Sequence, residues 1–173
     1  MTRELALLVI VAVAALLVGT GVWAWRRRVR RDGGLTAPVG EAPPDADVIA
    51  RFAGFYVATT RHDEPLERLA IRGLAFRSRV EAVITTAGIA LELPGQPRLF
   101  VPASVIVAAD QATVAIDRVV EKGGLARVSW RIDTQTVVDS YFRPQDTSTR
   151  GVVDAVATLI PAQTPNTPTG SDA

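Results

Sequence analysis

The longest hydrophobic stretch lies at the start of the chain. The 21 residues from Leu5 to Trp25 carry no charge and are interrupted only by a Gly-Thr-Gly triplet. As an α-helix rising about 1.5 Å per residue, this stretch would be roughly 31 Å long, enough to cross the hydrocarbon layer of a membrane. A buried helix of a soluble protein is usually shorter and carries a polar face, which this stretch lacks. The pattern therefore predicts a transmembrane helix over residues 5–25, preceded by an N-terminal stub of residues 1–4.

Positive charge is concentrated immediately after this stretch. We call the five arginines there the arginine collar: Arg26, Arg27, Arg28, Arg30 and Arg31. The other flank has only Arg3, which Glu4 offsets. Because basic residues stay on the cytoplasmic side, we expect a single-pass plasma-membrane protein with its N-terminus outside and its C-terminal domain in the cytoplasm. The collar is also a candidate contact for anionic lipid headgroups.

A cleaved signal peptide is the main alternative for this segment. Such a peptide has a basic start, a shorter apolar run and a cleavage site of small residues. Here the positive charge lies at the opposite end, and Gly19-Thr20-Gly21 is a poor cleavage signal. The pattern favours an uncleaved anchor.

The residues outside the hydrophobic stretch divide into a linker, one domain and a tail. Residues 26–47 comprise the collar and a stretch rich in glycine and proline without apolar periodicity, which predicts a flexible or extended linker. Residues 48–160 are enough for a single domain. The Pro/Thr/Ser-rich residues 161–173 are predicted to be disordered.

Within the domain, hydrophobic and polar residues alternate with a period of two, which is typical of half-buried strands. The clearest example places Phe76, Val80, Ala82 and Ile84 on one face, with charged residues between them. About seven short antiparallel strands with tight turns are predicted, the pattern of a barrel or sandwich. The segments concerned are 52–60, 76–84, 89–93, 98–101, the short pieces 105–107 and 113–116, 128–132 and 136–142.

The patterns of two segments predict helices instead. Asp63 to Gly73 has the start and stop signals of a short helix: a capping residue, an early proline and a closing glycine. Residues 152–160 place apolar side chains on a single helical stripe, after the possible caps Asp146, Thr147 and Ser148. We expect this second helix to cover the open end of a small β-barrel.

Composition and charge narrow the possible functions. The chain has no cysteine, which leaves neither a disulfide framework nor a thiolate metal site. From Asp32 onward, 13 basic residues face 17 acidic ones, giving a net charge of −4. A mildly acidic domain is a poor nucleic-acid binder, so we expect no nucleic-acid partner.

The sequence shows no constellation that predicts catalysis. His62 is the single histidine; Asp63 and Glu64 beside it could make it a base or a metal ligand, but a solvated loop residue is the favoured interpretation. Ser104, Ser129 and Ser140 have no histidine partner in a plausible triad. We therefore predict no enzyme, no cofactor and no metal. Trp130, Phe76 and Phe100 are expected in the core.

Several short motifs resemble a known family. They are 56–60 (Tyr-Val-Ala-Thr-Thr), 73–77, 98–102, 117–120, 124–125, 128–130 and 141–143 (Tyr-Phe-Arg). The chain resembles small actinobacterial single-pass membrane proteins with a pleckstrin-homology (PH)-like domain, which are sometimes labelled transporters. The resemblance implies a mainly β, PH-like fold with a C-terminal capping helix, and it carries over no catalytic or binding residue.

In lipid-binding PH domains, basic residues near the first hairpin hold headgroup phosphates. By that resemblance Arg77 and Arg79, with Arg72 just before them, are candidate contacts for anionic lipid; a solvated sheet face is the alternative. The first functional hypothesis is a non-enzymatic, membrane-anchored module that recruits or scaffolds a protein at the cytoplasmic face. The others are an anionic-lipid sensor and an accessory subunit of a transport or export complex.

Overall fold

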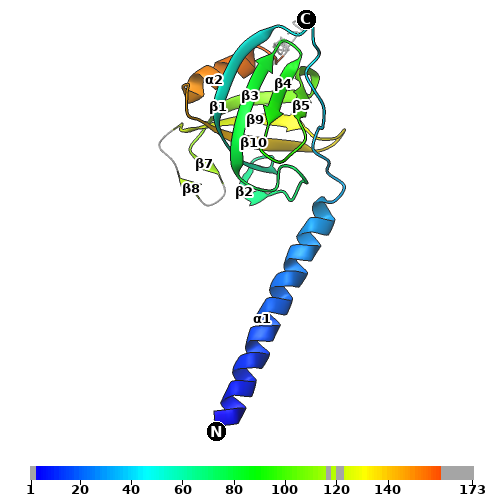
Figure 1. Cartoon of the computed structure of the whole chain (residues 1–173), viewed down its shortest axis with the longest axis vertical. Coiled ribbons are helices and arrows are strands. Elements are labelled where there is room, and N and C mark those ends of the chain that lie inside the picture. The colour runs from blue at the N-terminus through cyan, green and yellow to red at the C-terminus, as the bar shows by residue number, and fades with distance from the viewer. Residues whose placement is uncertain (1–2, 116–117, 120–122, 161–173) are drawn as a thin grey trace, which may run out of the picture.

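The computed structural model describes residues 3–115, 118–119 and 123–160. A long N-terminal helix, α1 (Arg3–Asp32), projects from a β domain (Figure 1). Its side chains are exposed along the apolar segment, and it is the one helix among the described residues that is long and apolar enough to span a membrane. The predicted segment 5–25 lies within α1, and the helix continues through the whole collar because no helix breaker intervenes before Gly33-Gly34.

The domain is built on one antiparallel sheet, in which seven strands follow the order β5-β4-β3-β1-β10-β9-β6 and an eighth, β2, pairs with β1. The long central strand is β1 (Val48–Arg61). The other elements are β2 (Glu64–Arg68), β3 (Ser78–Thr85), β4 (Gly88–Glu92), β5 (Leu99–Pro102), the 3-10 helix η1 (Ala103–Val105), β6 (Ile106–Ala112), β7 (Val114–Ala115), β8 (Arg118–Val119), β9 (Leu125–Arg131) and β10 (Val137–Pro144). The predicted sheet of about seven antiparallel strands is confirmed. The end strands β5 and β6 are not joined by a ladder in the described residues, so closure into a barrel stays a prediction.

The C-terminal helix α2 (Thr149–Ala157) confirms the predicted helical stripe. Ser148 caps it by accepting a hydrogen bond from the Gly151 backbone amide at 3.0 Å. Val152 and Val156 are buried and join the main core, and the helix packs mostly against β6 and β9. The predicted tail 161–173 and residue 116 of the predicted strand segment 113–116 lie outside the described residues.

The period-two pattern correctly identifies the buried face of β3, where Val80, Ala82 and Ile84 are buried, and Trp130 of β9 is buried as well. The prediction for Phe76 is wrong, because its side chain is 82% exposed. The strand begins only at Ser78, and the residues before it form turns anchored by a bridge between Arg72 and Thr36. Phe76 therefore never enters the pleat that would bury it. Phe100 is half-buried.

The predicted helix over Asp63–Gly73 is also wrong, because this segment contains strand β2. Asp63 takes a left-handed backbone conformation (φ 58°) that reverses the chain, and β2 then pairs with the end of β1. The Asp63 backbone amide donates to the Asp139 carboxylate at 3.1 Å. This long-range contact stabilises the turn and outweighs the local sequence signals that favour a helix.

The linker is extended, as predicted, but part of it belongs to the domain. The Phe100 amide donates to the Pro38 carbonyl at 2.8 Å, and the Gly40 amide donates to the Arg98 carbonyl at 3.1 Å. Leu35 and Ala37 pack against the main core. Residues 35–40 therefore follow the outer edge of β5 and cover a strand edge that would otherwise have unpaired backbone groups.

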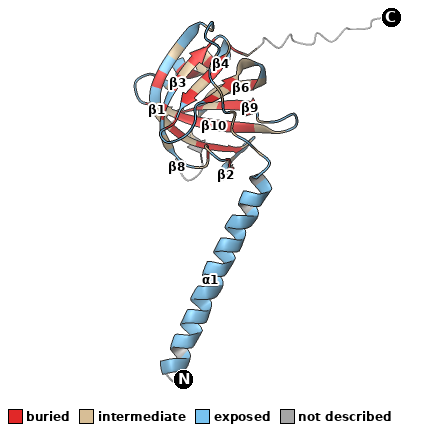
Figure 2. Cartoon of the chain, turned by 45° about the vertical axis from the view of Figure 1, so that its right-hand side comes forward, coloured by how far each residue is buried: buried red, intermediate tan, exposed pale blue. Residues whose placement is uncertain are grey.

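The buried residues are concentrated in the strands of the sheet (Figure 2). A chain of polar groups crosses this core. Trp130 Nε1 donates to Ser140 Oγ at 2.9 Å, and Ser140 Oγ lies 2.8 Å from Thr59 Oγ1. The Tyr56 hydroxyl lies 2.8 Å from Thr59 Oγ1 and donates to the Leu74 carbonyl at 2.7 Å. Burial raises the Tyr56 pKa, so this hydroxyl stays protonated and keeps its donor.

Candidate functional site

The arginine collar occupies the last turns of α1, where the helix meets the domain. Arg26, Arg27 and Arg30 are exposed, and the Arg27 guanidinium lies 5.6 Å from the centre of the Trp23 ring, one turn earlier. Arg31 contacts the domain: its Nη1 lies 2.6 Å from Glu67 Oε1 on β2. The side chain of Arg28 lies outside the described part of the structure. The collar thus has an exposed cationic part and one residue that fastens α1 to β2.

The Glu64–Glu67 pair on β2 gives a testable titration. The pKa of Glu67 is lowered, first by the hydrogen bond with Glu64 and then by Arg31, whereas the pKa of Glu64 is raised by the same bond. The stabilisation due to Glu67 is therefore present above the ordinary carboxyl pKa and is lost as the pH falls through its lowered value. We expect NMR titration of the side-chain carboxyls to show Glu67 protonating at lower pH than Glu64. Arg31→Gln should raise the Glu67 pKa, and Arg150→Gln should leave it unchanged; an unmoved Glu67 pKa in the first variant would contradict the contact.

The other candidate lipid contacts, Arg77 and Arg79, gather around a different residue. The Arg77 guanidinium lies 4.8 Å over the centre of the Phe55 ring, and Arg79 is the register partner of Phe55 across β1 and β3. Both arginines are exposed. Arg79 also shares the lining of a shallow cleft with Glu81 and Glu92. The two arginines share one sheet face, as the period-two pattern predicts, and carboxylates on that face dilute their charge.

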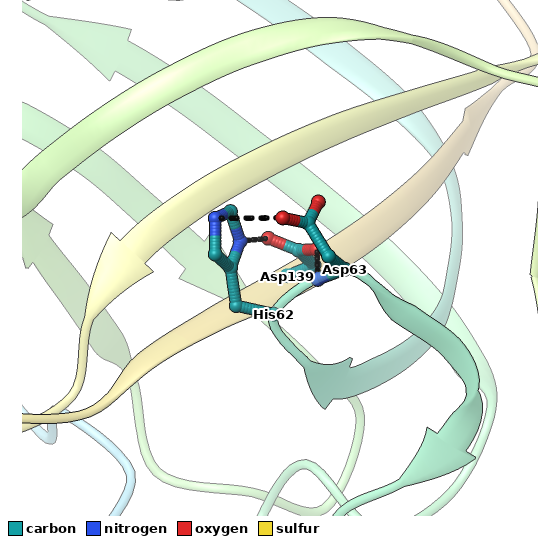
Figure 3. A group of neighbouring side chains, drawn as sticks. All are labelled: His62, Asp63 and Asp139. Atoms are coloured by element: carbon teal, nitrogen blue, oxygen red, sulfur yellow. Dashed lines mark hydrogen bonds and ion pairs between the residues drawn. The ribbon is translucent and has the colours of Figure 1, made fainter.

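A cluster that sequence analysis did not foresee joins the β1–β2 turn to the middle of β10 (Figure 3). His62 Nδ1 lies 2.8 Å from Asp139 Oδ1, and His62 Nε2 lies 3.5 Å from Asp63 Oδ2. The three side chains offer ligand atoms within 4.8 Å of one another, a spacing compatible with a metal ion. Asp139 is fully buried, whereas the His62 side chain is 40% exposed.

The surroundings of Asp139 decide what this cluster can do. Ser129 Oγ donates to Asp139 Oδ1 at 2.7 Å, and Arg127 Nη1 lies 3.5 Å from Oδ2. Arg127 also lies 3.4 Å from Asp63 Oδ1 and forms a bidentate pair with Asp110. The Arg127 guanidinium therefore already serves as the counter-charge of both carboxylates of the cluster. Its positive charge would repel a metal ion placed between them. We interpret the cluster as a polar network that fastens the β1–β2 turn onto β10.

His62 is an exposed residue in a turn, in line with the favoured interpretation, but one of its ring nitrogens is also bound to a buried carboxylate. Asp139 lies 77 residues further along the chain, so local sequence gave no sign of the pair. One signal was available: an aspartate within a largely apolar strand needs partners when it is buried.

The structure also places two large apolar side chains in solvent close to the end of α1. Leu66 of β2 is 69% exposed and Phe76 is 82% exposed. A cleft of about 620 Å³ lies beside them, between Val29 and Gly33 at the end of α1 and the domain segment Arg72–Gly73. Sequence patterns alone do not reveal this pairing, because Leu66 lies in a predicted helix and Phe76 at a predicted core position.

The structure has an antiparallel sheet of seven to eight strands and a C-terminal helix packed on that sheet, which define a β domain of the PH-like class. A candidate membrane-spanning helix precedes this domain. Residues 35–157, more than half of the chain, match the family described as Bacterial PH domain-like, and the chain belongs to that family. The match begins at the residues that follow the edge of β5 and ends with α2, so it covers the whole folded domain. None of the curated proteins compared with the chain matches it.

Proposed function

We propose that the chain is a membrane-anchored, non-enzymatic module whose PH-like domain recruits or scaffolds a partner protein at the cytoplasmic face of the plasma membrane. The observation that carries this proposal is α1, an apolar helix that is exposed along its length and leads directly into one β domain. Exposed apolar surface on this scale needs a non-aqueous environment.

The orientation rests on the collar. Five arginines follow the apolar segment, and basic residues near the end of a span are retained in the cytoplasm. The non-enzymatic part rests on the family, since PH-like domains are in general non-catalytic, and on the His62–Asp139 network, whose polar groups are engaged by Arg127 and Ser129.

A topology assay tests the anchoring and the orientation. A reporter that is active only in the cytoplasm, fused to the C-terminus of the full chain, should be active, and the fusion should sediment with the membrane fraction. Replacing Arg26, Arg27, Arg28 and Arg30 by glutamine and adding arginines before Leu5 should reduce this activity by inverting the charge bias. An active reporter in the soluble fraction, or an inactive reporter in the membrane fraction, would contradict the proposal.

Crosslinking in cells followed by affinity purification tests the recruiting role. The same partner should be recovered under several growth conditions from the wild-type chain. A Gly54→Val variant, which keeps the anchor but should not fold its domain, should lose that partner. Recovering no specific partner, or recovering it equally with both chains, would contradict recruitment by the domain.

Contact with anionic lipid is a second candidate, supported by the exposed side chains of Arg26, Arg27 and Arg30 at the end of α1. Each arginine near an anionic surface contributes about 1 kcal/mol of attraction, and salt screens it. Arg77 and Arg79 are a weaker basis, because Glu81 and Glu92 share their face. The role as accessory subunit of a transport or export complex stays a prediction.

A further inference from the structure

Leu66 and Phe76, the most exposed of the described large apolar side chains on the domain, belong to neighbouring segments. Arg68 at the end of β2 donates from Nη1 to the Ala75 carbonyl at 2.8 Å, so the segments that carry Leu66 and Phe76 are in direct contact. Single exposed apolar residues are common on protein surfaces and need no explanation. These two side chains are of functional interest because they lie next to the end of α1.

Two sets of contacts place both segments beside the end of α1. The Arg31–Glu67 ion pair holds the residue next to Leu66 against the collar. Val29 and Gly33 share a cleft with Arg72 and Gly73, and these two residues line a further cleft with Phe76. In both Figure 1 and Figure 2, β2 lies at the end of the domain that is nearest α1.

The helix geometry sets the height of this end above the apolar segment. From Trp25 to Arg31 an α-helix rises about 9 Å, and the headgroup region on each side of a bilayer is roughly 5–8 Å thick. A tilt of about 20°, which is usual for membrane helices, would lower Arg31 further. Glu67, and with it β2, therefore lies at the level of the outer headgroups when residues 5–25 span the membrane.

The charges around the pair suit this position. Arg26, Arg27, Arg30 and Arg72 are exposed near it. The nearby acidic residues are partly compensated, since Glu67 contacts Arg31 and Arg61, and Asp63 contacts Arg127. Apolar side chains surrounded by arginines are the composition that binds the interface of an anionic membrane.

We propose that Leu66 and Phe76 insert into the headgroup layer of the membrane that holds α1, so that the domain lies on the bilayer with β2 and the segment Arg72–Arg77 facing it. This inference rests on the proposed membrane anchoring. It assigns an orientation to the domain, in which α2 lies on the side away from the bilayer (Figure 1).

The absence of cysteine from the chain allows a direct test with single labels. Leu66→Cys and Phe76→Cys, each carrying an environment-sensitive fluorophore, are prepared in the full chain and reconstituted into vesicles of neutral and anionic lipid. A matched control is Arg150→Cys, at an 80% exposed side chain on α2. Leu16→Cys, within the apolar part of α1, reports the anchor itself.

Lipids with a shallow nitroxide quencher should reduce the fluorescence at positions 66 and 76 by at least about twofold in anionic vesicles, while position 150 should change little. Quenching at 66 and 76 no greater than at 150, with position 16 strongly quenched, would overturn the inference and leave the anchoring intact; a protein partner would then be the better occupant of this surface. Equal quenching at 66, 76 and 150 would overturn it too. An unquenched position 16 would contradict both the anchoring and the inference.

Discussion

Replacing Asp139 by alanine is expected to lower the free energy of unfolding of the domain by about 3–5 kcal/mol. The Asp139 carboxylate is fully buried and receives the Ser129 hydroxyl, the His62 ring and the Asp63 backbone amide. Arg127 lies beside it as the counter-charge. Alanine would leave all of these donors without their acceptor, and the β1–β2 turn would lose its attachment to β10.

Pulse proteolysis of the full chain in detergent micelles, over a series of urea concentrations, measures this effect on the domain. Asp139→Asn keeps the shape of the side chain and one carbonyl acceptor, so its loss should be smaller. Asp154→Ala on α2 is the matched control, because Asp154 is exposed and makes only a surface pair with Arg150. A loss below about 1 kcal/mol for Asp139→Ala would show that the network does not hold the turn.

The parts of the fold that sequence predicts are those with one buried and one solvated face. In β3 and α2 the buried side alternates with the polar side at the period of the element, so Val80, Ala82, Val152 and Val156 are placed correctly. The pattern fails where a single contact distant in sequence decides the conformation. Asp63 has the residues of a helix start around it, but its amide is held by Asp139, 76 residues away.

The candidate site divides in the same way. The collar could be predicted, because it depends on the order of apolar and basic residues along one helix. The His62–Asp139 network could not, since it combines a turn with the faces of β9 and β10 that point away from the main core, where Asp139 is paired with Ser129. Exposure of Phe76 was hidden for a similar reason: its position fits the alternation of β3, but the strand starts two residues later.

The connection between α1 and the domain is shorter than the composition of the linker indicates. α1 runs through the collar to Asp32, and Leu35 already packs against the core. Only Gly33 and Gly34 lie between these two parts, a stretch that spans at most about 7 Å when extended. The domain is therefore held close to the end of the helix, and a partner recruited by it would meet the membrane surface as well.

Replacing Gly54 by alanine is expected to destabilise the domain by about 3 kcal/mol or more, because β1 and β10 cannot pair as they do with a side chain at this position. A Cβ atom on Gly54 would lie 2.9 Å from the Cα atom of Pro144 and closer still to the Arg143 carbonyl oxygen. Both are backbone atoms of β10, and neither can rotate away as a flexible side chain would. Gly54→Val should prevent folding altogether.

Three other glycines separate the causes of this effect. At Gly88 an added Cβ would meet the backbone of β5 and the φ of +150° is also unfavourable, so Gly88→Ala should be as damaging as Gly54→Ala. At Gly95 the φ is +75° but the space is open, so Gly95→Ala should cost only about 1–2 kcal/mol. Gly34 has neither feature, and Gly34→Ala should be nearly neutral.

Urea-dependent pulse proteolysis of the four variants should rank their losses of unfolding free energy in this order. If Gly54→Ala were as stable as Gly34→Ala, β1 and β10 could not be as close as their register requires, and the sheet on which Asp139 and the β1–β2 turn depend would have to pair differently.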